Sequence, residues 1–263
     1  AALDCSNQKL GPGQLVVLSW WLSTEATAGV AGLDVSVNPI TGGKPITKWN
    51  GSEHEVVGYE VGSDDSGLEA FNLEESGVKN LNISSCGLGP KSIAIVAATL
   101  ATAGVASIDI LKNSIGDEGL SIMVELLEKS PSLGSITGIT EGQTTVDFSK
   151  QELSPFDIKI IAADFAATKF TAGLEAVDIS GNERLGLDKR GRGTEDHADW
   201  EARCEVLPKS AIKSFKAAEC QLNPKSITKL ASTLATAGLE RVDISGNTQM
   251  GADAGKAFVG LLN

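Results

Sequence analysis

Short stretches in which apolar and polar residues alternate recur along the chain as two related phrases. The first type is clearest at 81–90, LNISSCGLGP, and returns in recognisable form at 3–12, 146–155 and 215–224. The second type begins at Leu33, Ile108, Val177 and Val242, so the two types alternate along the chain. Such alternation predicts a short strand with one buried face. A chain built from these repeats is predicted to stack similar units into one elongated core.

A helix is predicted after each phrase of the first type. The phrase ends on a proline, which suits the first helical position because that position needs no N–H. Two of these prolines follow Ser154 and Asn223, which are good N-caps. Each helix is predicted to stop at the glycine of a TAG phrase. The prolines are Pro12, Pro90, Pro155 and Pro224, and the glycines are Gly29, Gly104, Gly173 and Gly238.

The sixth position of each phrase lies where the chain turns away from the strand. It is Asn38, Asn113, Asn182 and Asn247 in the second type, and Cys86 and Cys220 in the first, with Gln8 and Gln151 as departures. An asparagine at this point can bond the backbone of the neighbouring turn.

Together these positions resemble the leucine-rich repeat L-x-x-L-x-L-x-x-N/C-x-L, and the alternation of Cys and Asn types resembles its ribonuclease-inhibitor class. The resemblance implies a single α/β domain over 1–263, a curved solenoid of about eight repeats. Its parallel sheet would line the concave face and its helices the convex face.

Insertions interrupt the repeat near 43–66, 132–145 and 186–193. The first predicts a strand at Val56–Val61, followed by a shortened helix near Gly67–Glu75. The second predicts a hairpin around Glu141 and Gly142. The third contains Lys189, Arg190 and Arg192, which suit either an anion-binding loop or a solvated surface loop.

Composition narrows the function classes. A net charge of −12 disfavours binding to nucleic acid or to an anionic membrane surface, because proteins that bind these supply Lys and Arg. No stretch is long enough for a transmembrane helix. The four cysteines form no CxxC pair and read as buried thiols, which favours an intracellular compartment. The chain starts in mid-repeat, which suggests a segment of a longer protein.

No arrangement of residues predicts an enzyme. The two histidines, His54 and His197, fall in insertions, and no nucleophile, dinucleotide or zinc-protease motif occurs. Metal ligands could come from the cluster Glu195, Asp196, His197 and Asp199, but acidic residues in a first helical turn are already explained by the helix dipole. We therefore expect no cofactor and no metal.

The residue between the two apolar strand positions is predicted to lie on the concave face. This position is acidic in six of the eight phrases: Asp4, Asp34, Asp109, Asp147, Asp178 and Asp243. In the other two phrases it is Asn82 and Lys216. We call these eight positions the acidic row. Like charges on neighbouring strands repel, so folding alone does not explain the row. It predicts a groove for a basic segment or for cations. The alternative is a surface preference of the family, neutralised by Lys79, Lys112, Lys213 and Arg241 nearby.

Three functions follow. The first is a non-enzymatic scaffold that binds a protein partner through the acidic concave face, which favours a basic partner. The second is a regulator of an enzyme in trans, either a nuclease inhibitor or a GTPase-activating protein that presents Arg184, Arg190 or Arg192. The third is an architectural subunit with end-to-end contacts in an assembly.

Overall fold

The computed structural model describes residues 1–27, 29–167, 169–182, 185, 211–234 and 238–248. The chain divides into two compact units, Ala1–Thr140 and Glu141–Asn263, here called unit 1 and unit 2. Each unit is an α/β structure built on a parallel sheet, as the alternating phrases predict. The predicted loop at Lys189, Arg190 and Arg192, the third insertion and the acidic cluster at 195–199 lie outside the described residues.

Unit 1 contains four parallel strands in the order β1-β2-β5-β6. They are β1 (Ala2–Asp4), β2 (Gly32–Asp34), β5 (Asn80–Asn82) and β6 (Ser107–Asp109). The register places equivalent phrase positions side by side: Leu3, Leu33, Leu81 and Ile108 form one line across the strands. The repeat in the sequence is thus a repeat in space.

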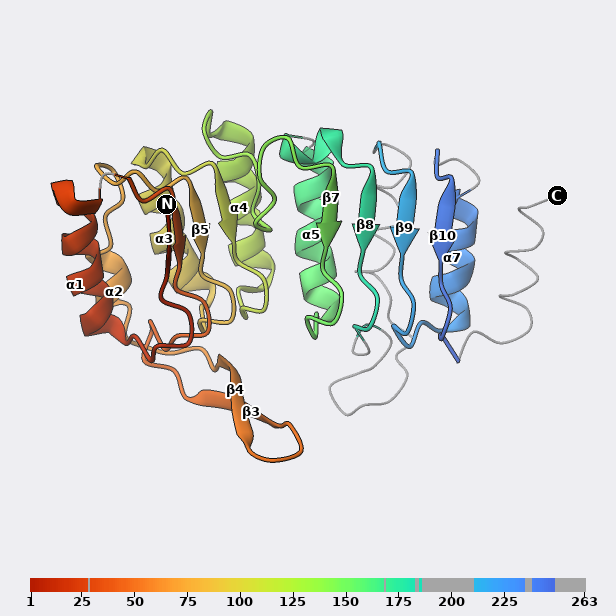
Figure 1. The fold of residues 1–263 in the computed structure, drawn as a ribbon, viewed down its shortest axis with the longest axis horizontal. Helices are drawn as coiled ribbons and strands as arrows, with labels where there is room; N and C mark the ends of the chain where they lie inside the picture. The colour runs from red at the N-terminus through yellow and green to blue at the C-terminus, as the bar shows by residue number, and fades with distance from the viewer. Residues whose placement is uncertain (28, 168, 183–184, 186–210, 235–237, 249–263) are drawn as a thin grey trace. The chain divides into compact units, whose positions relative to one another are not determined.

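The helices of unit 1 lie on one side of its sheet (Figure 1). They are α1 (Pro12–Leu22), η1 (Glu25–Thr27), α2 (Ser66–Glu69), α3 (Pro90–Thr102) and α4 (Gly116–Lys129). Helix α3 buries Ile93, Val96, Ala97 and Leu100 on one face. Helix α4 follows a second-type phrase and was not predicted from the prolines. It buries Leu120, Met123 and Leu127, which share one helix face.

Unit 2 repeats the arrangement with strands in the order β10-β9-β8-β7. These are β7 (Thr145–Asp147), β8 (Ala176–Asp178), β9 (Ser214–Lys216) and β10 (Arg241–Asp243), with α5 (Pro155–Ala167), η2 (Phe170–Gly173) and α7 (Pro224–Leu234). Both predicted N-caps are confirmed. Ser154 Oγ accepts the N–H of Asp157 (3.2 Å), and Asn223 Oδ1 accepts the N–H of Ser226 (3.0 Å).

The glycine stops predicted at Gly29, Gly104 and Gly173 are wrong. Helix α3 ends at Thr102, its C-cap Ala103 has extended backbone (φ −77°, ψ 147°), and Gly104 has no positive φ. Helix α1 ends at Leu22, seven residues before Gly29. The chain leaves α3 by extending directly into the next strand, so no left-handed cap is needed.

The phrase asparagines tie neighbouring turns together, as predicted. Asn113 Oδ1 accepts the N–H groups of Cys86 and Leu88, both at 3.0 Å, and its Nδ2 donates to the carbonyls of Ile83 and Ile110, also at 3.0 Å. Equivalent bonds are made by Asn38, Asn182 and Asn247. All four asparagines are buried, so their bonds satisfy backbone groups that water does not reach.

The first insertion is a β-hairpin that projects from unit 1 (Figure 1). Strand β4 (His54–Tyr59) matches the predicted strand, and its antiparallel partner β3 (Pro45–Trp49) was not predicted. The predicted helix at Gly67–Glu75 shortens to α2.

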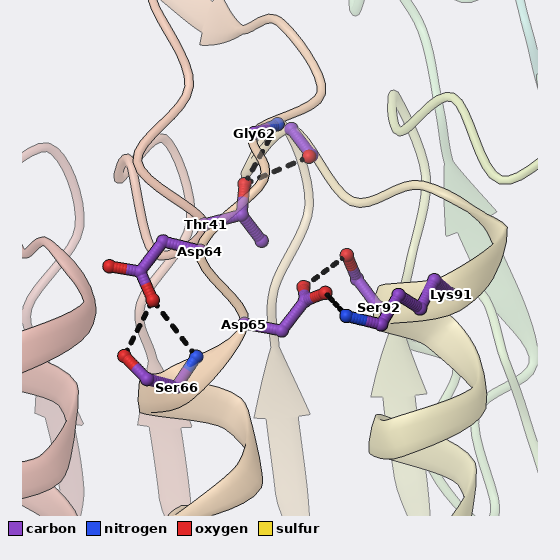
Figure 2. Close-up of polar contacts among 8 residues, drawn as sticks. Thr41, Gly62, Asp64, Asp65, Ser66, Lys91 and Ser92 are labelled. Atoms are coloured by element: carbon purple, nitrogen blue, oxygen red, sulfur yellow. Dashed lines mark hydrogen bonds and ion pairs between the residues drawn. The ribbon is translucent and has the colours of Figure 1, made fainter.

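Polar contacts fix the hairpin's root to the turn before α3 (Figure 2). Thr41 Oγ1 accepts the N–H of Gly62 and donates to the carbonyl of Gly87. The buried carboxylate of Asp65 accepts from Ser92 Oγ at 2.7 Å and lies 3.1 Å from Lys91 Nζ. A Cβ at Gly62 would lie only 1.8 Å from the carbonyl oxygen of Thr41, so the root admits no side chain there.

The hairpin predicted in the second insertion is wrong. Residues 134–138 instead run beside β6, where Ser135 bridges Ser107 and Thr137 bridges Asp109. Leu133, Ile136 and Ile139 are buried. Burial of three apolar residues spaced by three outweighs the local β-turn signal at Gly142.

Candidate functional site: the acidic row

The acidic row lies on the sheet face opposite the helices, and each unit holds half of it. In unit 1, Asp4, Asp34, Asn82 and Asp109 stand in register on adjacent strands. In unit 2, the equivalent line is Asp147, Asp178, Lys216 and Asp243. The apolar residue before each, such as Leu33 or Val177, is buried toward the helices, so alternation turns the row outward.

Each row aspartate also has a local structural role that the sequence analysis missed. Its Oδ1 accepts the backbone N–H two residues later, which closes an Asx-turn at the end of the strand. The bond is 2.8 Å from Ser36 to Asp34, 2.9 Å from Leu111 to Asp109 and 2.8 Å from Ser149 to Asp147. Asp4, Asp178 and Asp243 make the same bond, as does Asn82. Folding therefore does favour Asp or Asn at this position, contrary to the expectation from charge repulsion alone.

Each unit handles the repulsion between its aspartates differently. In unit 2, Lys216 Nζ lies 3.2 Å from Asp178 Oδ2 on the neighbouring strand. In unit 1, the equivalent residue is Asn82, whose Nδ2 donates to Asp34 Oδ2 at 3.0 Å. Of the cations predicted to neutralise the row, Lys79 donates to the carbonyl of Gly104 and Lys213 lies 3.8 Å from Glu175.

The hydrogen bonds of the turns lower the pKa of three aspartates in the row. The hydroxyl and N–H of Ser6 lower the pKa of Asp4 below its ordinary value, and the N–H and hydroxyl of Ser245 lower the pKa of Asp243. Burial alone would raise the pKa of Asp178, but hydrogen bonds from Ser180 and the charge of Lys216 outweigh it, so that pKa is also lowered. These carboxyls are therefore ionised at neutral pH.

A hollow of about 370 Å³ opens on the row face of unit 1. Its floor consists of the residues two positions before the row on each strand, and the row itself lines it beside Gly138. The floor residues are Ala2, Gly32, Asn80 and Ser107. These residues were not predicted as part of a site, although the same alternation places them on the face of the row.

The other residues that could carry chemistry are not assembled into a site. Within the described residues, no group of three or more His, Cys, Asp or Glu side chains could hold a metal ion. His54 packs edge-on against Trp49 on the hairpin, with ring centroids 5.2 Å apart. Burial raises the pKa of the Cys86 thiol to about 12 and that of Cys220 to about 11, which leaves both thiols protonated and unreactive. Each donates to a carbonyl of the preceding repeat, Val35 or Ile179, at 3.2 Å.

Comparison with known proteins leaves the family open. No protein-family model matches the chain, and no curated protein matches it. Among solved structures, the yeast Rad7–Elc1 complex contains a chain 11% identical to this one, with a TM-score of 0.34. The TLR13–ssRNA13 complex contains one 14% identical, with a TM-score of 0.28.

The alignments cover 96% and 83% of this chain but only 64% and 26% of those two chains. Likeness at this level carries no functional argument. Separately, no helix among the described residues is both long and apolar enough to cross a bilayer.

Proposed function

We propose that the chain is a leucine-rich repeat protein of the ribonuclease-inhibitor-like class, and that it is a non-enzymatic scaffold. In this proposal it binds a basic segment of a partner protein along the acidic row. The observation that carries the proposal is the register of the row: carboxylates from adjacent parallel strands stand side by side on an exposed sheet face in both units, Asp4 beside Asp34 and Asp147 beside Asp178.

The spacing of these charges suits an extended basic segment. Neighbouring strands are about 4.8 Å apart, so the row offers a carboxylate or amide at each step across the sheet. An extended peptide places side chains of one face about 6.6 Å apart, which is close enough to the strand spacing for flexible lysine side chains to reach neighbouring members of the row. Complementary charge of this kind selects the partner and speeds its association.

The test uses amide substitutions, because Asn82 already shows that asparagine keeps the turn. The triple variant Asp109→Asn, Asp147→Asn, Asp178→Asn removes three charges while each Oδ1 can still accept its N–H. Its matched control is Glu74→Gln, Glu118→Gln, Glu128→Gln, which removes three exposed charges away from the row.

The measured quantity is binding to poly-L-lysine and to a set of basic proteins at several salt concentrations. We expect the row variant to bind at least tenfold more weakly and with a shallower salt dependence, while the control stays within twofold of the parent. Equal losses of affinity in both variants would mean that only the net charge of the protein matters, and would refute the proposal.

An architectural role is a second candidate, favoured by the surface of α1. This helix contains no charged residue, and it leaves Val17 63% and Trp20 69% exposed. Exposed apolar side chains on one helix are typical of a covered surface. Native mass measurement distinguishes the two roles: a monomer whose mass and elution do not change with Trp20→Lys would exclude assembly through α1.

A further inference from the structure

The hollow in unit 1 differs from the rest of the row because its floor contains a polar group with no partner. Ser107 lies two residues before Asp109 on β6, so both side chains belong to the same face of the strand. Ser107 is 1% exposed and lines the hollow. Within the described residues its hydroxyl is buried and makes no hydrogen bond. A buried hydroxyl without a partner is unfavourable, so its persistence at a hollow points to a ligand that supplies the bond.

In unit 2 a lysine of the chain itself occupies the equivalent position beside the row. There the third strand contributes Lys216, which pairs with Asp178 of the neighbouring strand. Unit 1 has Asn82 at that position, and none of its four row positions is basic. The row of unit 1 therefore has the same acidic flanks as the row of unit 2 but lacks the internal cation.

The floors of the two rows differ in the same sense. Unit 2 has Thr145, Ala176, Ser214 and Arg241 where unit 1 has Ala2, Gly32, Asn80 and Ser107. Three of the four residues are smaller in unit 1, and only Asn80 is larger than its counterpart Ser214. Gly138 contributes as well, because a Cβ there would come within 3.2 Å of the Asp109 side chain.

We propose that the hollow of unit 1 receives one lysine side chain of the partner, which takes the place that Lys216 fills in unit 2. This inference rests on the proposed function and names the group that the row recognises. The ammonium has three donors and no acceptor. Asp34, Asp109 and Ser107 all line the hollow and carry acceptor oxygens. Acceptors on different strands suit the separate donors of an ammonium better than the planar fork of an arginine.

The first experiment titrates the protein with Nα-acetyl-lysine methylamide and follows backbone amide resonances by NMR. We expect saturable shifts at Ser107, Asp109 and Gly138, and shifts at least threefold smaller at Asp178. The uncharged analogue Nα-acetyl-norleucine methylamide should produce none. Equal shifts in both rows would overturn the assignment to unit 1.

Two substitutions separate the lysine site from general attraction. Asn82→Lys gives unit 1 the lysine that unit 2 has at Lys216. A lysine cannot accept the N–H two residues later, and in unit 2 Ser180 Oγ accepts that N–H, of Ala218, instead. Ser36 is the equivalent serine in unit 1. We expect this variant to bind the lysine amide at least tenfold more weakly, and its matched control Asn82→Gln, which loses the same turn bond without adding charge, to stay within threefold of the parent.

Ser107→Ala provides the sharper readout. If the hydroxyl forms its hydrogen bond only with a bound ligand, its removal weakens lysine binding about threefold and leaves the melting temperature unchanged or higher. A melting temperature lowered by several degrees with unchanged binding would make Ser107 purely structural and overturn the inference. If the triple row variant loses poly-L-lysine while Asn82→Lys and Ser107→Ala change nothing, the row function stands and the lysine site fails.

Discussion

Replacing Asn113 by alanine should destabilise unit 1 more than any exposed substitution. Its Oδ1 and Nδ2 together make four hydrogen bonds of 3.0 Å to backbone groups of two neighbouring turns. The residue is 8% exposed, so water does not replace those bonds. At about 1 kcal/mol for each bond, the loss is about 4 kcal/mol. That is a large fraction of the stability of a typical domain.

The assay is urea unfolding followed by far-ultraviolet circular dichroism, with hydrogen exchange as a local measurement. We expect Asn113→Ala to lower the free energy of unfolding by about 3–5 kcal/mol. The amides of Cys86 and Leu88 should then exchange faster, because both donate to Asn113 Oδ1.

Asn50→Ala is the matched control. Asn50 Oδ1 also accepts two backbone N–H groups, from Ser52 and Glu53, but in an exposed turn. Its loss should cost less than about 1 kcal/mol, since water can satisfy the same groups. A similar loss for both variants, or unchanged protection at Cys86 and Leu88, would refute the argument that buried backbone bonds hold neighbouring turns together.

Three further predictions test other parts of the structure. The Cys86 and Cys220 thiols, with pKa values raised by burial to about 12 and about 11, should not react with a disulfide reagent at pH 8 until urea unfolds the chain; rapid labelling of native protein would contradict their burial. Gly62→Ala should lower the melting temperature or displace the hairpin, whereas Gly13→Ala, with open space around its Cβ, should be neutral or slightly stabilising. The pKa of Asp178 is lowered in the folded state, so its contribution to stability is present above the unfolded pKa near 3.9 and is lost as pH falls through the folded pKa. Asp178→Asn should therefore flatten the pH dependence of the free energy of unfolding below about pH 4. An unchanged slope would exclude this contribution.

The parts of the fold that were predicted depend on residues whose local chemistry leaves few alternatives. A proline after a strand phrase has a fixed φ and no N–H, and all four such prolines begin helices. Alternation of apolar residues likewise places every row residue on the outward face. The same reasoning fails at Gly104, because glycine permits a left-handed cap without requiring one.

The missed features depend on contacts between segments far apart in the chain. Residues 134–138 contain β-branched residues and a nearby turn, which locally favour a hairpin, but backbone bonds to β6 and burial of Ile136 hold them elsewhere. The hollow was missed for a related reason. Ala2 and Ser107 stand on the two edge strands of one sheet, and only the register shows that they share one floor.

The departures from the cysteine pattern have a structural explanation of the same kind. Cys86 and Cys220 lie after strands β5 and β9, each of which is paired on both sides. Each thiol donates to a carbonyl of the preceding repeat. Gln8 and Gln151 follow β1 and β7, which are edge strands of the two described sheets. Their side-chain amides donate to carbonyls of their own turns, Ser6 and Asp147. A buried thiol needs a covering neighbour, whereas a glutamine tolerates water, so within each described sheet the cysteine follows a strand that the preceding strand covers. On this argument Cys86→Gln should strain the interior of unit 1, while Gln8→Cys should fold normally and leave its thiol open to reagents.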